Sequence, residues 1–454
     1  MKFCIAPLRM SNTLRNRTAY ALLACAALLA YGNSFFGVFQ FDDYRAIVNS
    51  PSSISWSAWL NELGQGLRPL LKLSYLLNAA LSEGVFGFHL FNLLVHTGNA
   101  LLVYQLALHW GAAQDKTRDW RNAALFGALL FAVHPLHSEA VTYISGRSMS
   151  LMTFFYLAAL LVYARGQTSG SSSLRWLSVS LFILAMLTKE SAVLFPLTLL
   201  LWEWSCRTPW RTMGRRLWPF GMLFVLAVCV LLLHPGYSNL MWDSVQTRSW
   251  HDSLLTQSYV SVAQSGKLLW PFALNIDPDW AVIKSISAVW PQLILIGTAG
   301  LCAAWFYRSR PWWSWGLMWL LLHAFLLNAF FPRADIANER QLYWASWPLL
   351  LALAIELERF FTRRVFLGLT GALLVVLMVA TQQRNTVYHS EIALWQDTAG
   401  KSPNKARVWN NLGYAYQAAG RTDDAVAAYC MAIKLNPDHV KAHNNLSRLG
   451  AACP

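Results

Sequence analysis

The stretch TAYALLACAALLAYGNSFFGVFQFDDYR, residues 18–45, joins a long apolar run to two adjacent carboxylates. The apolar part, from about Thr18 to Phe39, is long enough to cross the hydrocarbon core of a bilayer as a helix. It is too long for a signal-peptide core and has no convincing small-residue cleavage site, so we expect a retained first helix. Basic residues precede the run, which predicts a cytoplasmic N-terminus and places Asp42 and Asp43 on the outer face.

The composition extends this interpretation to the whole chain. Of the 454 residues, 56% are hydrophobic and only 13% are charged, whereas soluble domains average about a quarter charged residues. Apolar runs of about twenty residues recur along the chain, and they predict an all-α, polytopic membrane protein of about eleven transmembrane helices. The expected spans begin near Thr18, His89, Asn122, Ser148, Leu174, Ser191, Leu217, Val289, Trp312, Tyr343 and Val365.

The net charge of +14 does not indicate a nucleic-acid partner, because the basic residues gather in short loops between the apolar runs. With about eleven spans, each of these loops lies on the cytoplasmic side, as the positive-inside rule requires. The odd count leaves the C-terminal tail outside. The basic loops hold Lys116, Arg118, Arg121, Arg165, Arg175, Arg207, Arg211, Arg215, Arg216, Arg308, Arg310, Arg359, Arg363 and Arg364.

Two expected outer segments, 41–87 and 235–288, are too long to be tight turns. The first is rich in Trp, Ser and Leu, which favours amphipathic helices lying on the membrane. The second contains a semi-apolar stretch from Tyr259 to Leu274, which we expect to dip into the bilayer without crossing it.

After Thr381 the sequence becomes polar and repeats itself. The segment SPNKARVWNNLG (402–413) is echoed by NPDHVKAHNNLS (436–447), at the roughly 34-residue period of tetratricopeptide repeats. The chain therefore divides into a transmembrane domain, residues 1–381, and a tetratricopeptide-repeat (TPR) domain, residues 382–454. Since about three repeats are usually needed for an independent stack, the TPR domain must pack on the membrane domain, on a partner, or on a half repeat at 391–400.

The seven cysteines show no CxxC motif and no Cys/His spacing typical of a metal site. Most lie in or beside apolar runs, where a cysteine is usually an inert packing residue. Cys430 and Cys453 lie in the TPR domain, and a disulfide between them is one alternative if that domain faces an oxidising compartment.

The adjacent acids Asp42 and Asp43 are the candidate catalytic residues. Neighbouring side chains point to opposite sides of an extended backbone, and diverge by roughly 100° in a helix. We therefore expect one of them to act as a general base, while the other orients a loop or caps the following helix. A like charge next door and partly dehydrated surroundings favour a raised pKa for one of the two. The sequence does not distinguish them.

Four basic residues break the charge rule, because they lie on the predicted outer face: Arg68, Arg147, Lys189 and Arg340. A single such residue is usually a snorkelling side chain. Four of them on the face that carries two acids favour a shared anion, and the phosphate of a membrane lipid would satisfy them.

Further polar residues accompany these cations on the outer face, and we expect them to position a substrate. They are His134, His137, Glu139, Glu190, Glu339 and Tyr343. The two histidines could also bind a metal together with Asp42 or Glu139, but such pairs more often hydrogen-bond to a substrate or to the backbone. We therefore predict neither a metal nor another cofactor.

These motifs resemble those of the transmembrane and TPR-containing O-mannosyltransferases, and of their bacterial relatives, within the C superfamily of glycosyltransferases (GT-C). The resemblance runs in order through nearly the whole chain, and its most specific block is His-Pro-Leu-His-Ser-Glu-Ala. The matching pieces are Phe41-Asp42-Asp43, Arg68-Pro69-Leu70, GFHLFNLLVH (87–96), LFAVHPLHSEAV (130–141), Gly146-Arg147, Lys189-Glu190, Glu339-Arg340-Gln341-Leu342-Tyr343 and the terminal repeats.

The resemblance implies the GT-C fold of about eleven spans and a polyprenyl-phosphate-linked sugar donor. The acceptor would be a protein hydroxyl or a glycan on the extracytoplasmic face, and the acidic pair carries over to Asp42 and Asp43. It also implies a bacterial inner membrane, with the N-terminus cytoplasmic and the TPR domain periplasmic. The repeat tail is short, whereas eukaryotic members have many copies, so the acceptor class and the sugar stay open.

This resemblance predicts an inverting transfer, in which one aspartate takes the acceptor proton while the lipid phosphate leaves, with its charge stabilised by Arg and Lys. The TPR domain would recruit the acceptor or an accessory protein, or would be a structural cap. Two other classes remain open. A transporter for lipid-linked glycans would show mid-membrane charges and broken helices in an internal repeat, whereas a membrane-anchored TPR scaffold would keep partner binding without the two acids.

Overall fold

The computed structural model describes residues 6–64, 66–330 and 335–453. Within these ranges the chain forms helices and connecting turns, without a β-strand. Each of the expected spans overlaps one helix. These helices are α1 (Ala6–Tyr31), α4 (Phe86–Gln114), α5 (Arg121–Val133), α7 (Arg147–Ser169), α8 (Ser172–Thr188), α9 (Phe195–Ser205), α10 (Trp210–Leu233), α13 (Trp290–Ser309), α14 (Pro311–Leu320), α16 (Trp347–Phe360) and α17 (Arg363–Thr386).

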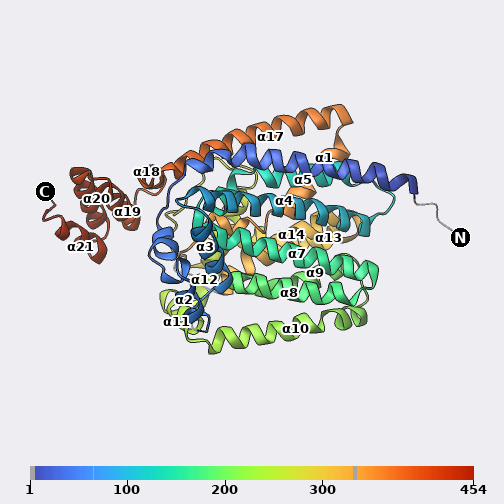
Figure 1. Ribbon diagram of the computed structural model, residues 1–454, viewed down its shortest axis with the longest axis horizontal. Helices are drawn as coiled ribbons and strands as arrows, with labels where there is room; N and C mark the ends of the chain where they lie inside the picture. Colours follow the sequence, from blue (N-terminus) through green and yellow to red (C-terminus); the bar gives the residue numbers. More distant parts are fainter. Residues whose placement is uncertain (1–5, 65, 331–334, 454) are drawn as a thin grey trace.

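The long helices lie side by side along the longest axis of the molecule and form a bundle (Figure 1). α1 begins at one end of the bundle, and the TPR domain projects from the other end. The shorter helices α2 (Trp56–Glu62), α3 (Pro69–Leu81), α11 (Pro235–Thr247) and α12 (Trp250–Gly266) also lie at the TPR end. The segments predicted to be outside the membrane therefore share one end of the bundle.

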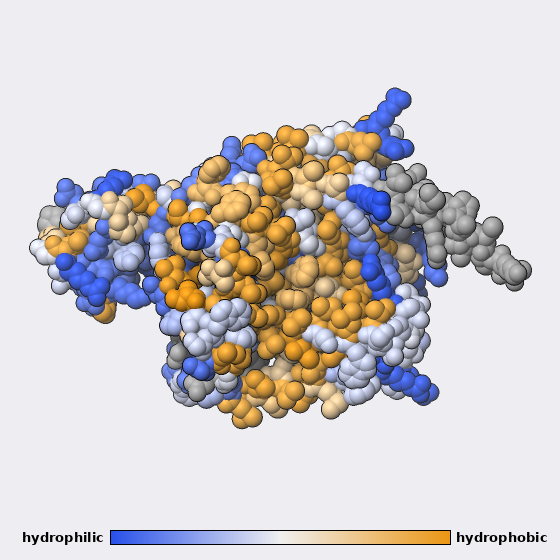
Figure 2. Space-filling view, viewed as in Figure 1, coloured by the Kyte–Doolittle hydropathy of each residue, from blue (hydrophilic) through white to orange (hydrophobic). Residues whose placement is uncertain are grey.

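The surface of the bundle is that of an integral membrane protein. Five helical stretches of the described chain are long and apolar enough to cross a bilayer, and a sixth if α5 and the Pro135–Val141 helix, bent by 51°, count as one span. Figure 2 shows apolar residues over the middle of the visible face and hydrophilic residues toward its two ends. Met222 and Val225 on α10 and Val375 on α17 are largely exposed, as expected for side chains that face lipid.

The two long segments predicted to lie outside the membrane both contain short helices. The first contains the π-helical turn Tyr44–Val48 followed by α2 and α3. In the second, the predicted dipping stretch is divided, because α12 ends at Gly266 and residues 267–274 continue as turns. This irregular chain runs beside the candidate site described below.

Four helices build the TPR domain: α18 (Glu391–Lys401), α19 (Ala406–Ala418), α20 (Thr422–Leu435) and α21 (Val440–Arg448). α19 packs closely on α20 because Gly413 has no Cβ, which would lie 2.6 Å from the Tyr429 ring. α18 serves as the expected half repeat, since Trp395 packs with Val408 and Leu412 in one core. The Cys430–Cys453 disulfide joins α20 to the last residues, with its Cα atoms 5.4 Å apart.

The TPR domain is fastened to the bundle by ion pairs. Asp277, in the irregular segment after α12, accepts hydrogen bonds from Lys405 Nζ (2.6 Å) and from Arg407 Nε (2.9 Å). Arg407 also donates to Asp335 over 2.7 Å. On α17, Arg384 Nη1 donates to Asp397 of α18 over 2.9 Å. α17 itself continues past residue 381 to Thr386, so the TPR helices follow directly from the last helix of the bundle.

Candidate active site

A pocket lies where the first outer loop, the turn after α5, the loop before α16 and the TPR domain meet. It is open to solvent, and Asp42, Glu139, Tyr143, Arg340 and Arg407 are among its lining residues. The lining residues come from five separate parts of the chain, because Ile276 and Asp277 of the segment after α12 also line the pocket. We call this space the Asp42 pocket.

The backbone around the acidic pair forms a tight turn that separates the two carboxylates. Phe41 has a φ of 46°, which is a left-handed backbone conformation. This conformation costs free energy in any residue with a Cβ atom, and it is often found at functional sites. The Asp43 amide donates to the Gln40 carbonyl over 2.8 Å, and the Gln40 amide donates to Asp43 Oδ2 over 3.0 Å. This turn directs Asp42 and Asp43 to different sides.

Asp43 points into the protein. Its carboxylate is fully buried, and Oδ1 accepts a hydrogen bond from the Ser145 amide over 2.8 Å and another from the Ser145 hydroxyl. Burial raises the pKa of Asp43 to about 7, although the hydrogen bonds from Ser145 and Gln40 act in the opposite direction. Asp43 therefore joins the first outer loop to the turn before α7, and it does not line the Asp42 pocket.

Asp42 faces the pocket. Its amide donates to the Tyr143 hydroxyl over 3.0 Å, which fixes the backbone. Within the described part of the chain, its carboxylate makes no hydrogen bond or ion pair, whereas the other acids that line the pocket are paired. A half-exposed carboxylate without a partner can accept a proton from a substrate hydroxyl.

Glu139 holds Arg340 at the opposite wall. The Arg340 amide donates to Glu139 Oε2 over 2.9 Å, and Arg340 Nε lies 3.6 Å from Oε1. Burial disfavours the charge of Arg340, but Glu139 outweighs it, and the pKa of Arg340 stays above its ordinary value. No hydrogen bond from the two terminal guanidinium nitrogens is present among the described residues. These nitrogens can therefore bind an anionic oxygen.

The His-Pro-Leu-His-Ser-Glu-Ala block forms the short helices that carry Glu139. Residues 135–137 form a 3₁₀ turn and α6 (Ser138–Val141) follows it. Gly146 packs against the end of this segment, since a Cβ there would lie only 2.0 Å from the Glu139 carbonyl oxygen. The sequence thus brings Glu139 and the turn before α7 into direct contact.

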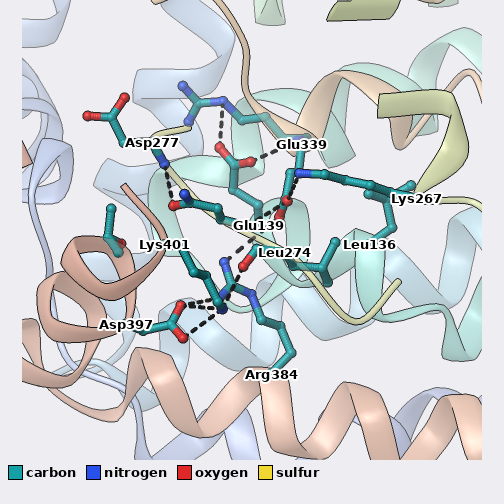
Figure 3. Close-up of polar contacts among 12 residues, drawn as sticks. Leu136, Glu139, Lys267, Leu274, Asp277, Glu339, Arg384, Asp397 and Lys401 are labelled. Carbon is teal, nitrogen blue, oxygen red and sulfur yellow. Dashed lines mark hydrogen bonds and ion pairs between the residues drawn. The ribbon is translucent and has the colours of Figure 1, made fainter. Parts of the chain in front are cut away.

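Glu339 has a structural position next to Arg340. Figure 3 shows its carboxylate between Lys267 and Arg384. Lys267 Nζ and the Asn275 amide each donate to Glu339 Oε1 over 2.7 Å. The charge of Glu339 therefore holds the irregular segment after α12 against α17. We give Glu339 this structural role, and its role in positioning a substrate stays a prediction.

Arg68 forms a bidentate pair with Glu190, with N–O distances of 2.9 and 2.7 Å. Arg68 adopts a left-handed φ of 56° at the start of α3. Burial disfavours the charge of Arg68, but the carboxylate of Glu190 outweighs burial and keeps the pKa of Arg68 above its ordinary value. Lys189 is buried in the turn that carries Glu190. None of these three lines the Asp42 pocket, which leaves Arg68 and Glu190 beside the site.

Arg147 does not line the Asp42 pocket, contrary to the expectation that it shares an anion with Arg340. Its side chain is fully buried, and its guanidinium donates to Asn92 Oδ1 (2.7 Å), to the Ser74 carbonyl (3.1 Å) and to the Phe88 carbonyl (3.0 Å). The Phe91 ring lies 4.4 Å from its guanidinium carbon. Arg147 is thus buried between α3, α4 and α7, where its guanidinium binds oxygens of the protein.

The two histidines and Tyr343 are also buried in the bundle. His134 Nε2 lies 3.1 Å from the Leu268 carbonyl, His137 Nδ1 lies 2.9 Å from the Phe131 carbonyl, and the Tyr343 hydroxyl lies 2.8 Å from His96 Nδ1. The structure therefore gives them protein partners and no position in the pocket. In the described ranges, no three His, Cys, Asp or Glu side chains converge as metal ligands.

The TPR domain contributes to this pocket, which was not predicted from the sequence. Trp395 of α18 and Arg407 of α19 line it, together with Asp277 and Asp335. One signal was available. Lys405 and Arg407 flank the first residue of α19, where the helix dipole disfavours cations, so acidic partners outside the repeat could have been expected.

Fold and site together define an integral membrane protein with an acid–arginine pocket closed by a TPR domain. Residues 406–439 match the family model of the tetratricopeptide repeat. A Caenorhabditis elegans protein O-mannosyl-transferase is 27% identical over 458 residues, which cover 92% of this chain and 63% of the relative. Human protein O-mannosyl-transferase TMTC3 is 26% identical, over 95% of this chain and 53% of its own length. Human protein O-mannosyl-transferase TMTC4 is 28% identical, over 90% of this chain and 65% of its own length.

The chain therefore resembles the TMTC protein O-mannosyl-transferases along nearly all of its own length. It spans between about half and two thirds of these relatives.

Proposed function

We propose that this protein transfers a sugar, mannose or another hexose or pentose, from a polyprenyl-phosphate carrier to a hydroxyl group of a protein. The single observation that carries the proposal is the unpaired Asp42 carboxylate facing the anchored Arg340 guanidinium in one pocket. The similarity to named protein O-mannosyl-transferases supports the reaction class and a protein acceptor.

The reaction would be an in-line displacement at the anomeric carbon. Asp42 accepts the proton of the acceptor hydroxyl as its oxygen bonds to the sugar. The bond between the anomeric carbon and the phosphate oxygen breaks, and the lipid phosphate leaves with the electron pair. Arg340 stabilises the charge that develops on this phosphate. The polyprenyl phosphate that leaves is a phosphate monoester and a good leaving group, so positioning and charge stabilisation suffice and we propose no metal or cofactor.

The positions of the other groups give them supporting roles in this proposal. Glu139 orients Arg340, and Asp43 holds the loop that presents Asp42. Arg68, fixed by Glu190, would bind the carrier phosphate from its lipid side. The TPR domain closes the pocket through Trp395 and Arg407, and it would receive the acceptor.

The same proposal assigns the pocket to the extracytoplasmic face. It puts the N-terminus in the cytoplasm and the TPR domain in the periplasm of a bacterial inner membrane. The Cys430–Cys453 disulfide supports an oxidising compartment on the TPR side, and the basic loops at the other end support a cytoplasmic side there.

The test is a direct transfer assay. The purified chain in lipid nanodiscs is incubated with polyprenyl-phosphate-linked mannose, glucose or arabinose and a mixture of Ser/Thr-containing peptides. Mass spectrometry should detect consumption of one donor and a matching hexose or pentose on a peptide hydroxyl. If every donor is recovered intact in the presence of acceptor peptides, the transferase proposal fails. Retained partner binding would then favour the scaffold, and movement of an intact donor across the bilayer would favour the transporter.

A further inference from the structure

The turn between α9 and α10 carries a group of arginines at the end of the bundle opposite the TPR domain (Figure 1). Arg207 lies in this turn, and Arg211 and Arg215 lie in the first two turns of α10. All three residues are exposed. We call them the α10 arginine cluster.

The cluster lacks acidic partners, although an acid lies close to it in the sequence. That acid, Glu203, is already bound by Arg216, whose Nη1 donates to its two carboxylate oxygens over 2.9 and 3.2 Å. In the described ranges, no hydrogen bond or ion pair of the Arg207, Arg211 or Arg215 guanidinium is present. Their charge is therefore uncompensated, and the helix dipole at the start of α10 makes it more costly.

Arg207 connects the cluster to the end of α13. Its guanidinium carbon lies 5.6 Å from the centre of the Tyr307 ring. The Tyr307 hydroxyl donates to the Trp204 carbonyl over 3.0 Å, and the two rings stack with centroids 4.3 Å apart. These contacts hold the turn before α10 beside the end of α13, where the next residue, Arg308, is also exposed.

One exposed face of α10 changes from basic to apolar along the helix. Successive spacings of four and three residues place five side chains on this face: Arg211, Arg215, Trp218, Met222 and Val225. The three apolar residues are 54%, 65% and 61% exposed. A tryptophan between a basic and an apolar part of a helix is typical of a membrane–water interface. The face therefore presents cations at the depth of lipid headgroups and apolar side chains at the depth of acyl chains.

α13 shows the same order in the opposite chain direction. Leu301, Trp305 and Arg308 follow one another at spacings of four and three residues, so they share one face of the helix. Leu301 and Trp305 are 74% and 81% exposed. Both helices thus present apolar surface that ends in cations at the same end of the bundle.

We propose that the α10 arginine cluster binds the headgroup of an anionic phospholipid, whose acyl chains lie along the apolar face of α10. The inference goes beyond the proposed sugar transfer and does not depend on it. Guanidinium groups bind phosphate oxygens through parallel hydrogen bonds, and the apolar face selects a lipid over a soluble phosphate because only a lipid contacts both parts. Three unpaired arginines favour a lipid with two phosphates, such as cardiolipin, over a lipid with one.

Cations at this end do not by themselves make a lipid site, because the positive-inside rule already places basic residues there. Lys116, Arg363 and Arg364 are exposed cations at the same end. They are divided between two separate turns, and no tryptophan follows the two arginines in α17. These three residues therefore provide a control with the same charge and without the features of the cluster.

The test is native mass spectrometry of the full-length protein in detergent micelles, titrated separately with cardiolipin, phosphatidylglycerol and phosphatidylethanolamine. The wild type should bind cardiolipin most tightly and phosphatidylethanolamine most weakly. The triple variant Arg207→Gln/Arg211→Gln/Arg215→Gln should lose about fivefold in cardiolipin affinity for each arginine, or about a hundredfold in total. Lysines at the same three positions should retain most of the affinity, because the charge remains.

The matched control is Lys116→Gln/Arg363→Gln/Arg364→Gln, which removes the same number of exposed cations from the same end. It should bind cardiolipin as the wild type does. An equal loss in both triple variants would show that cardiolipin responds only to overall charge, and would overturn the site. Equal wild-type affinities for cardiolipin and phosphatidylethanolamine would overturn it as well. Binding of soluble glycerol phosphate as tightly as the lipid would contradict the assignment to a lipid.

Thermal unfolding in detergent separates a lost site from a lost fold. Without added lipid, both triple variants should unfold at the wild-type temperature, because the substituted residues are exposed. Cardiolipin should raise the unfolding temperature of the wild type and of the control, but not that of the cluster variant. If the cluster variant does not fold, Arg211→Gln/Arg215→Gln carries the same test, with an expected loss of affinity of about 25-fold.

Discussion

Asp42 and Asp43 are neighbours in the chain, yet they belong to two different regions of the molecule. The Asp42 carboxylate lies in a pocket beside Arg340, whereas Asp43 is buried and bound to Ser145 and Gln40. The arginines show the same division. Arg340 keeps its terminal nitrogens at the pocket, while Arg147 gives its donors to protein oxygens. A charged residue near a membrane surface can therefore either take part in catalysis or hold loops together. Only the groups with which it pairs show which of these two roles it has.

The largest expected effect is that of Asp42→Asn. Removing a positioned base should lower the rate of sugar transfer by about 10²–10⁴-fold, with an unchanged thermal unfolding temperature, because no contact of its carboxylate is lost. Transfer is measured by mass spectrometry of the acceptor peptide. Asp43→Asn is the control, and it should retain transfer to within about tenfold while its stability changes. If Asp43→Asn lowered the rate of transfer more than Asp42→Asn did, the assignment of Asp42 to catalysis and of Asp43 to structure would be wrong.

Arg340→Gln should have the next largest effect on transfer. Losing the charge that stabilises the leaving phosphate should lower kcat by about 10²–10³-fold, and Arg340→Lys should recover part of it, since the charge remains without the planar donors. Arg364→Gln is the matched control, because Arg364 is exposed at the start of α17. Equal kcat values for Arg340→Gln and Arg364→Gln would remove Arg340 from the mechanism.

Arg147→Ala should act on folding. It leaves the Ser74 and Phe88 carbonyls without their donor and opens space among Tyr75, Phe88 and Phe91. We expect the free energy of unfolding to fall by about 3 kcal/mol or more, measured by thermal unfolding in detergent. Any fraction that stays folded should keep the donor KM of the wild type. A raised donor KM with unchanged stability would return Arg147 to the phosphate site.

The last effect is the pH dependence of stability that comes from Asp43. Its pKa is about 7 in the folded protein and near 3.8 in an unfolded chain, so between these values only the folded state holds the proton. The free energy of unfolding should fall as pH rises from about 4 to about 7, and level off above that. The total change is roughly 4 kcal/mol at most.

Asp43→Asn tests this slope because asparagine is neutral at every pH. Thermal unfolding of the wild type and the variant, compared between pH 5 and pH 8, should show the steeper decline in the wild type. Parallel declines in both proteins would mean that Asp43 does not titrate in this interval.

Much of the architecture follows from local sequence patterns. Apolar runs predict the helices from α1 to α17, and the repeat beginning at Ser402 predicts α19 to α21, because both signals depend on neighbours along the chain. The pairing of Arg68 with Glu190 and of Arg340 with Glu139 is also in keeping with charges placed near hydrocarbon, for which a partner is expected.

The division between catalytic and structural charges could not be predicted in this way. A charge pattern indicates depth in the membrane, but the burial of Arg147 depends on Ser74 and Phe88, two distant carbonyls. The separation of Asp42 from Asp43 depends on the left-handed backbone conformation of Phe41. A phenylalanine in the sequence does not predict that conformation. Arg407 reaches the pocket because Asp277 binds it across 130 residues, a contact that neither repeat nor hydropathy encodes.

The most direct test of the central claim, that Asp42 is the base, changes the acceptor. A thiol has a pKa of about 8.5 and needs less help in losing its proton than a hydroxyl. Transfer by wild type and Asp42→Asn is measured with paired Ser and Cys peptides. We expect the Cys-to-Ser rate ratio to rise by at least about tenfold in Asp42→Asn. If Asp42→Asn slows both acceptors by the same factor, Asp42 does not remove the acceptor proton.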